Sequence, residues 1–219
     1  MDKSPSHRLL AHPLLAGLSD EALAFALAFF RARREEFPRG ALLKQADAPL
    51  PAFGIVESGR IQVRLTDMEG SEVLMAAVGP SDSFGESLAY LGVPNSPVYI
   101  VAEEDSAVWW FYPDALHRTD AIAADSARLA ERFTALLAER ALAMNDRIQI
   151  LSKPTLRQKL LCLFSQVERK SGARSFTLPF DREGLATYLG VNRCALSREL
   201  SSLKKAGVID YYKNSFKIL

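Results

Sequence analysis

Two short polar groupings lie ten residues apart in the segment FGESLAYLGVPNSPVYIV, residues 84–101. A glycine leaves backbone N–H groups accessible, and the glutamate beside it supplies a carboxylate, so this pair resembles half of a pocket for a polar ligand. The alternative is that Glu86 only accepts hydrogen bonds from backbone N–H groups of a turn. The candidate pocket residues are Gly85, Glu86, Ser87, Asn95 and Ser96.

A second grouping, of arginines and a serine, lies in the segment RCALSRELSSLKKAG that follows Asn192. Arg193 and Ser197 are four residues apart and therefore share one side of a helix, with Arg198 beside them. Arginine can bond O6 and N7 of guanine in a bidentate manner, and a serine hydroxyl suits a phosphate. The alternative for Arg198 is an ordinary surface ion pair with Glu199.

Two short helices and a hairpin would position these arginines. Asp181 can N-cap the first helix, Gly190 can end it in the left-handed conformation, and Asn192 can N-cap the second. Two short helices joined by a tight glycine turn form a helix-turn-helix, whose second helix enters the major groove of DNA. The segment VIDYYKNSFKIL, residues 208–219, predicts a β-hairpin wing in which Lys213 can reach phosphates. The leucines expected to face inward are Leu185, Leu189, Leu196, Leu200 and Leu203.

The candidate pocket lies among short β-rich segments. Residues 14–34 predict a helix that Ser19 or Asp20 can cap. Downstream, short runs of alternating apolar and polar residues are separated by turns that contain Gly, Pro or Asp. This pattern is typical of a small antiparallel roll, and the fold class is therefore α+β.

A long helix is predicted between the roll and the C-terminal helices, because Asp114 to Leu151 contains neither glycine nor proline. Its apolar residues recur every three or four positions, a spacing that suits pairing with the same helix of a second copy. The alternative is that the helix only packs on its own roll. Pro154 breaks the helix and is the predicted hinge. The predicted dimer-interface residues are Leu129, Phe133, Leu137, Met144 and Ile148.

The charge of the chain is unevenly distributed, although the formal net charge is +1. Residues 152–219 carry 13 Lys and Arg against 5 Asp and Glu, which is typical of a nucleic-acid-binding module. Two cysteines, Cys162 and Cys194, do not form a disulfide framework or a thiolate cluster. The N-terminus lacks the pattern of a secretory signal and no apolar run is long enough to span a membrane. We therefore expect a cytoplasmic protein with no membrane partner.

Nearly the whole chain resembles the cyclic-AMP receptor/fumarate-nitrate regulator (Crp/Fnr) family of bacterial transcription factors. FDREGLATYLGVNRCALSRELSSLKKAGVIDYYKNSFKIL is similar to its winged helix-turn-helix, and AFGIVESGRIQV and DSFGESLAYLG are similar to its effector roll, a double-stranded β-helix. The resemblance implies a sensing roll with N-terminal helices over residues 1–113, a dimerisation helix over 114–151 and a DNA-binding domain over 152–219. It also implies a homodimer that binds double-stranded DNA, and RNA polymerase as a partner if the protein is an activator.

The resemblance implies roles for the residues of the second helix. The two base-reading arginines of the family match Arg193 and Arg198, and Cys194 replaces an acidic reader, so the preferred operator should differ. The residues expected to contact DNA are Asn192, Arg193, Cys194, Ser197, Arg198 and Lys213.

The resemblance also tests the candidate pocket as a cyclic-nucleotide site. Gly85 and Glu86 match the start of the family's phosphate cassette, but its Arg-Ser pair falls on Asn95 and Ser96. A phosphate would lose a bidentate charged partner, a contribution of about 1.5–3 kcal/mol. Cyclic nucleotides are therefore disfavoured, and a different small molecule in an apolar roll pocket is the leading prediction.

Other effector and function classes can be compared in the same way. Iron-sulfur sensors of the family need N-terminal cysteines, which are absent before Cys162. A haem sensor stays an alternative, with His7, His12 or a methionine as axial ligand; the third histidine, His117, is expected on the surface like the others. A cupin-like metalloenzyme needs several histidines inside the barrel, so we expect neither a metal site nor an enzyme. A protein-binding adaptor is the remaining alternative.

Overall fold

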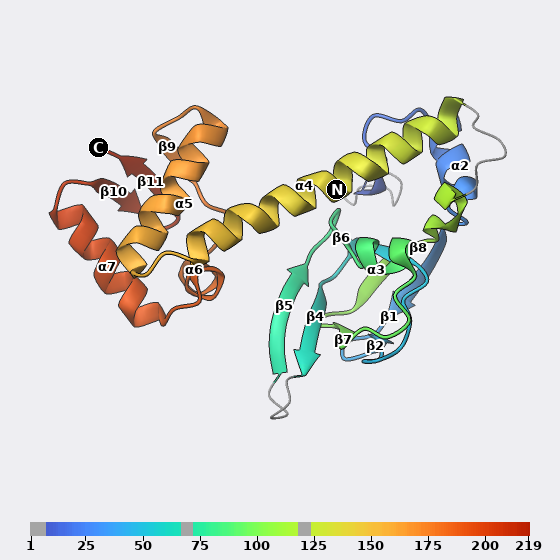
Figure 1. Ribbon diagram of the computed structural model, residues 1–219, viewed down its shortest axis with the longest axis horizontal. Coiled ribbons are helices and arrows are strands. Elements are labelled where there is room, and N and C mark those ends of the chain that lie inside the picture. Colours follow the sequence, from blue (N-terminus) through green and yellow to red (C-terminus); the bar gives the residue numbers. More distant parts are fainter. Residues whose placement is uncertain (1–7, 67–71, 118–123) are drawn as a thin grey trace. The chain divides into compact units, whose positions relative to one another are not determined.

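The computed structural model describes residues 8–66, 72–117 and 124–219, which form two compact units, Met1–Ala138 and Glu139–Leu219 (Figure 1). The boundary between the units falls inside one long helix, α4 (Ala124–Leu151). Each unit has its own hydrophobic core, so each is described by itself. The three-part division at residues 113 and 151 stays a prediction.

The first unit contains two four-stranded antiparallel sheets. One has the order β1-β8-β3-β6 and the other β2-β7-β4-β5. The strands of the first sheet are β1 (Arg33–Phe37), β8 (Ser106–Phe111), β3 (Phe53–Ser58) and β6 (Ser83–Phe84). Those of the second are β2 (Leu42–Lys44), β7 (Val98–Ala102), β4 (Ile61–Thr66) and β5 (Glu72–Val78). The predicted antiparallel roll and the α+β class are confirmed.

The central strands β8 and β3 of the first sheet are buried on both faces, because their residues alternate between two apolar clusters. Val56 and Trp110 pack with residues of the second sheet, such as Ile100. Phe53 and Phe111 point the other way, into a cluster that contains Phe133 of α4. The roll therefore holds the start of α4 through a layer of stacked and tilted aromatic rings.

The N-terminal helix is shorter than residues 14–34, which the sequence predicts. Helix α2 is Asp20–Phe29, and Ser19 caps it by accepting a hydrogen bond from the backbone N–H of Ala22. The chain then reverses at Arg31, whose φ is 48°, and Arg33 pairs with Trp110 in the first sheet. Helical propensity in the last residues is overridden because β1 completes the edge of that sheet.

Two further helical segments differ from the sequence prediction. Helix α3 (Glu86–Leu91) follows Gly85 within the segment that raised the question of a ligand site, and it was not predicted. The long helix does not start at Asp114, because Pro113–His117 forms the 3-10 helix η1 and the described part of α4 begins at Ala124.

The apolar stripe of α4 is divided between two environments. Leu129 and Phe133 are only 3% and 2% exposed because they pack into the core of the roll, and Leu137 lies partly buried beside them. Met144 and Ile148, further along, are 66% and 61% exposed. Leu129 and Phe133 therefore already have contacts within the protomer, and the dimer interface stays a prediction.

The second unit is a small helical domain with a three-stranded sheet of order β10-β11-β9. After the break at Pro154, its elements are α5 (Leu156–Ser171), β9 (Ser175–Thr177), α6 (Arg182–Leu189), α7 (Arg193–Lys205), β10 (Ile209–Tyr212) and β11 (Ser215–Ile218). Asp181 and Asn192 cap α6 and α7 as predicted, and Gly190 has a φ of 64°. The five predicted inward leucines are buried in one core. Strand β9 was missed, because three residues carry too little pattern.

Candidate DNA-binding face and effector pocket

The N-terminal half of α7 presents a polar face to solvent. Arg193, Cys194, Ser197 and Arg198 are all exposed, because the helix uses its leucine side for the core. A shallow hollow on this face is lined by Ser197, Arg198, Ser201, Ser202 and Lys205. The sequence had indicated Lys205 as a residue that can reach phosphates, but Ser201 and Ser202 were missed, although Ser201 continues the i, i+4 spacing from Ser197.

The two arginines differ in what they contact. Arg193 Nε lies 3.5 Å from a carboxylate oxygen of Glu183 in α6, with both side chains mostly exposed. Within the part of the chain that the structure describes, Arg198 has no hydrogen bond or ion pair. Glu199 is instead 3.4 Å from Arg157, so the alternative of a surface pair between Arg198 and Glu199 is not observed. The Arg198 guanidinium is therefore available for an external acceptor.

The wing places one predicted and one unpredicted residue at its turn. Lys213 has a φ of 52°, and its ammonium lies 5.6 Å from the centre of the Tyr212 ring, which is 75% exposed. Asn214 anchors the turn by donating a hydrogen bond from its side-chain amide to Leu178 O at 3.0 Å. Lys204, in contrast, bonds the Asp210 carboxylate at 2.6 Å and thereby lowers the pKa of Asp210. Tyr212 is the wing residue that charge-based reasoning could not find.

The five candidate pocket residues lie at the start of α3 and in the loop before β7. Gly85 is in the left-handed conformation at the start of α3, with a φ of 82°. Ser87 and Asn95 are exposed, whereas Glu86 and Ser96 are buried. The Ser96 carbonyl accepts a hydrogen bond from the Asp47 backbone N–H at 2.8 Å. These residues therefore shape the α3 turn and the loop before β7, and their role as an effector pocket stays a prediction.

Glu86 belongs to a buried hydrogen-bonded chain. Ser83 Oγ donates to Glu86 Oε1 at 2.5 Å, and His12 Nε2 lies 2.8 Å from Ser83 Oγ. The backbone N–H of Leu14 donates to His12 Nδ1 at 3.2 Å, so a neutral His12 donates through Nε2. The glutamate thus links α3 to the N-terminal segment, a role beyond the turn-capping alternative.

The histidines correct one expectation. His12 was expected on the surface but is 1% exposed, because Leu9, Leu14 and Leu15 bury the first turns of the chain. Its two ring nitrogens are both hydrogen-bonded, as the chain with Ser83 shows. His117 Nε2 bonds Tyr90 O at 3.0 Å, and its ring stacks on that of Tyr90. His7 lies outside the described residues.

Substitution of Ser83 by alanine should show how much the hydrogen bonds that link His12, Ser83 and Glu86 contribute to the free energy of unfolding. The change removes the hydroxyl that bonds both His12 and Glu86, and losing a buried partner costs about 1–3 kcal/mol of unfolding free energy. Urea unfolding can be followed by tryptophan fluorescence, since both tryptophans lie in β8 of the same unit. Ser87→Ala, on the exposed side of α3, is the matched control and should change stability by less than about 0.5 kcal/mol. Equal effects of the two changes would contradict a structural role for the chain.

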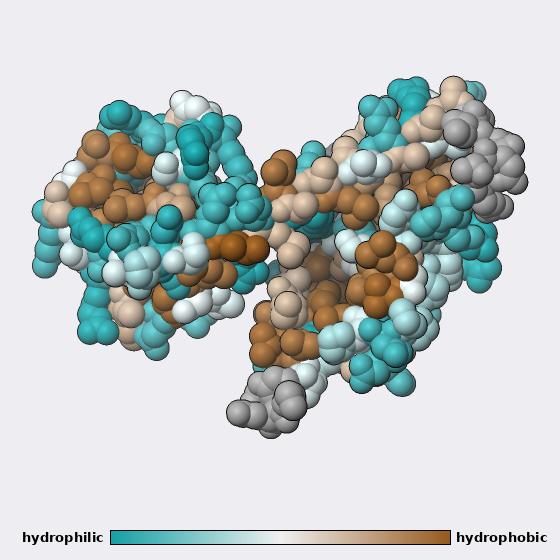
Figure 2. All heavy atoms as spheres, viewed as in Figure 1, coloured by the Kyte–Doolittle hydropathy of each residue, from teal (hydrophilic) through white to brown (hydrophobic). Residues whose placement is uncertain are grey.

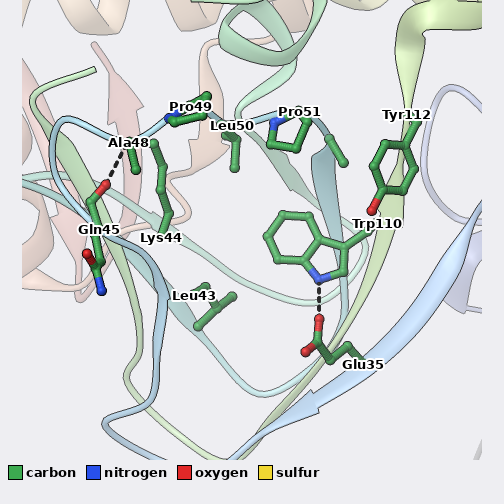
Figure 3. Close-up of a pocket in the computed structure, with 11 residues that line it drawn as sticks. Glu35, Leu43, Lys44, Gln45, Ala48, Pro49, Leu50, Pro51, Trp110 and Tyr112 are labelled. Carbon is green, nitrogen blue, oxygen red and sulfur yellow. Dashed lines mark hydrogen bonds between the residues drawn. The ribbon is translucent and has the colours of Figure 1, made fainter. Parts of the chain in front are cut away.

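A cavity of about 320 Å³ opens in the roll beside the candidate residues (Figure 3). Trp110 and Tyr112 form an aromatic wall, and the Trp110 indole N–H donates to Glu35 at 3.0 Å. The aliphatic lining consists of Leu43, Ala48, Pro49, Leu50, Pro51 and Ala52, and the polar lining of Glu35, Lys44 and Gln45. The volume is at the small end of ligand sites, so the cavity fits a compact molecule.

The lysine of this cavity, Lys44, is held by hydrogen bonds to backbone carbonyls. Lys44 Nζ donates to Val98 O at 2.7 Å, Gln45 O at 2.8 Å and Ser96 O at 3.3 Å. An ammonium has three donors, so Lys44 uses all of them and connects β2 to the loop before β7. Burial lowers the pKa of Lys44 from its usual value. The Lys44 ammonium therefore lies near Asn95, but it is hydrogen-bonded to carbonyls and has no donor left for a phosphate.

Neither a metal site nor a membrane-spanning helix is found among the described residues. Across 8–66, 72–117 and 124–219, no group of three His, Cys, Asp or Glu side chains is placed to hold a metal ion. In those same ranges, no helix combines the length and the hydrophobicity needed to cross a bilayer.

Two family models match the chain over most of its length. Residues 34–119 match the cyclic nucleotide-binding domain, and residues 127–219 match the Crp-like helix-turn-helix domain. The chain belongs to the Crp/Fnr family. It is a DNA-binding transcription regulator with an effector-binding domain, and the family consists of regulators, which are not enzymes.

Individual relatives of this Crp/Fnr regulator align with it over most of the length of both chains. The cyclic AMP receptor protein of Thermus thermophilus is 28% identical over 200 residues, which cover 90% of this chain and 88% of the relative. Among solved structures, the catabolite activator protein of Thermus thermophilus has a TM-score of 0.53 at 24% identity, covering 94% of this chain and 93% of that one. A CooA mutant from Carboxydothermus hydrogenoformans has a TM-score of 0.61 at 18% identity, covering 87% and 85%. The structural likenesses, at this identity, concern the fold.

Proposed function

We propose that this regulator is a cytoplasmic homodimer whose two α7 helices read a palindromic operator in response to a small effector that is not a cyclic nucleotide. The observation that carries the proposal is the exposed polar face of α7, with Arg198 free of partners in the described chain. In a helix-turn-helix dimer, the half-sites lie about one DNA turn apart. Asn192, Arg193, Cys194, Ser197 and Lys213 complete the contact set, and RNA polymerase is a further partner if the regulator activates.

The effector part of the proposal is supported by what the roll offers. The cassette start at Gly85 and Glu86 is present, but Asn95 is exposed and uncharged and the buried Lys44 has no donor left. A cyclic phosphate would therefore lack a charged partner. The haem alternative has no support from His12, because both of its ring nitrogens are already hydrogen-bonded. Effector binding would shift the population between two arrangements of the protein.

The dimer part rests on the second half of α4. Met144 and Ile148 are large apolar side chains that remain exposed, together with Leu151 on the same side of the helix. Exposed apolar residues aligned along a helix are typical of a helix-pairing surface. Because Leu129 and Phe133 pack on the roll, we assign the central dimer contacts to Met144 and Ile148.

The change Ile148→Glu tests dimerisation and operator reading together. A charge at this position should dissociate the homodimer, since burying it in a helix pair costs several kcal/mol. Analytical ultracentrifugation should show the wild type as a dimer and the variant as a monomer. Duplexes selected from a random library by the wild type should be palindromic, and the variant should bind them at least about tenfold more weakly.

Ala143→Glu is the matched control, because Ala143 is exposed on another side of α4. It should remain dimeric and bind the selected duplexes as the wild type does. A monomeric wild type, or selected DNA without two-fold symmetry, would refute the proposed function.

A further inference from the structure

The aromatic cavity of the roll is separate from the cassette residues that sequence reasoning proposed. None of Gly85, Glu86, Ser87, Asn95 or Ser96 lines it. Its walls are the rings of Trp110 and Tyr112 on one side and the turn from Ala48 to Ala52 on the other, as Figure 3 shows. A flat apolar ring fits between such walls better than a ribose or a phosphate does.

The charged groups of the cavity favour one sign of ligand charge. Lys44 is 5% exposed, and its three ammonium hydrogens are all donated to backbone carbonyls. An anionic ligand would therefore meet a cation that has no hydrogen bond to give. Moving the Lys44 ammonium would take its donor away from the part-buried Val98 carbonyl, which is unfavourable.

Glu35, in contrast to Lys44, still has hydrogen-bonding capacity that no residue of the described chain uses. In the described chain, its carboxylate accepts one hydrogen bond, from the Trp110 indole N–H, and forms no ion pair. A carboxylate can accept about four hydrogen bonds, so Glu35 retains acceptor capacity at the cavity wall. Its strand neighbour Glu36 and the buried Glu57 are both bound to Arg34 at 2.7 Å. Glu35 is thus the one acidic side chain of β1 and β3 that has no cation among the described residues.

We propose that the roll binds a small aromatic amine in this cavity, with its ring against Trp110 and its ammonium on Glu35. The ammonium also gains from the nearby aromatic faces, because a cation is attracted to the face of an aromatic ring. The proposal rests on the proposed function, in that it names the chemical class of the effector of the same roll.

Leu50 connects this cavity with the start of α3. It lines the cavity, and its Cδ2 occupies the space beside Gly85, 2.4 Å from where a Cβ would be at that position. A ligand that packs on Leu50 would therefore press on the glycine that sets the direction of α3. The cavity is thus coupled by contact to the segment that the sequence indicated, without sharing its polar atoms.

The test uses three probes with the same ring and different charges: phenethylamine, 2-phenylethanol and phenylacetate. Isothermal titration calorimetry on the full-length protein measures each dissociation constant. We expect phenethylamine to bind about tenfold more tightly than the alcohol, and phenylacetate to bind most weakly. The change Glu35→Gln should abolish the preference for the amine and leave affinity for the alcohol within about twofold.

Glu36→Gln is the matched control, since Glu36 is the next residue of the same strand, is bound to Arg34 and does not line the cavity. It should keep the preference for the amine. Equal or tighter binding of phenylacetate, persistence of the preference in Glu35→Gln, or no binding of any probe at millimolar concentration would overturn the proposal. Selection of palindromic DNA by the same preparations reports on the proposed function separately, so the two failures are distinguishable.

Discussion

Replacing Arg198 by alanine should abolish the preference of this regulator for its operator while leaving the fold intact. The guanidinium is exposed and free of partners in the described chain, so its removal disturbs no internal contact. A bidentate contact with guanine contributes about 1–3 kcal/mol to discrimination, which corresponds to about 5- to 150-fold in affinity. Mobility-shift titrations with the selected duplex and with a scrambled duplex measure this ratio.

Two control variants separate base reading from general attraction to DNA. Arg193→Ala should lose specificity to a smaller extent, because Arg193 must first give up its contact with Glu183. Lys213→Ala should weaken binding to the selected and the scrambled duplex to the same extent. It should also reduce the slope of log affinity against log salt concentration by about one. Full specificity in Arg198→Ala would show that α7 does not read bases at this position.

Replacing Gly59 by alanine should cause a large loss of stability of the roll. Gly59 joins β3 to β4 with a φ of 78°, and a Cβ there would lie 2.4 Å from the backbone oxygen of Asp105 and 2.3 Å from Ser106 Oγ. The left-handed backbone costs about 1–2 kcal/mol, and the clash adds about 1–3 kcal/mol because backbone must move. The unfolding free energy of the roll should fall by about 3 kcal/mol or more.

Gly40→Ala isolates the first of these two costs. Gly40 also has a positive φ, of 83°, but a Cβ there meets nothing within 4 Å. Its cost should stay near about 1–2 kcal/mol. Urea unfolding followed by the fluorescence of Trp109 and Trp110, both in β8, reports the roll in each variant. Similar losses in the two variants would mean that the approach of Asp105 relaxes without cost.

Elements with their own local signals could be predicted from the sequence. Asp181, Gly190 and Asn192 mark the ends of α6 and α7 by side-chain capping and by a left-handed glycine, and both effects act within a few residues. The leucine spacing then gave the buried face of each helix correctly. The antiparallel roll followed from short alternating segments and turns. These features share a local physical cause, so no tertiary information was required.

Elements set by distant partners could not be predicted in the same way. Arg33 and Arg34 look helical, yet pairing with β8 makes them part of a strand. The stripe of α4 looks continuous, but Phe133 packs on Phe53 and Tyr90, residues far away in the sequence. His12 looks like a surface histidine until the leucines around it are seen to be buried. The aromatic cavity combines residues from β1, β2 and β8, and no spacing rule brings them together.

The buried chain from His12 to Glu86 has a consequence for where the sensor begins as a folding unit. Arg132 of α4 also donates hydrogen bonds to the carbonyls of Leu14 and Ala16, at 3.3 and 2.8 Å. The segment that precedes every strand is therefore held between α3 and the long helix, as an integral layer of the sensor. Shortening the protein to the first β-strand would remove this layer and expose the apolar faces beneath it. The smallest autonomous sensor must accordingly include the chain from about residue 8 onward, since burial and hydrogen bonding decide how far a chain can be trimmed.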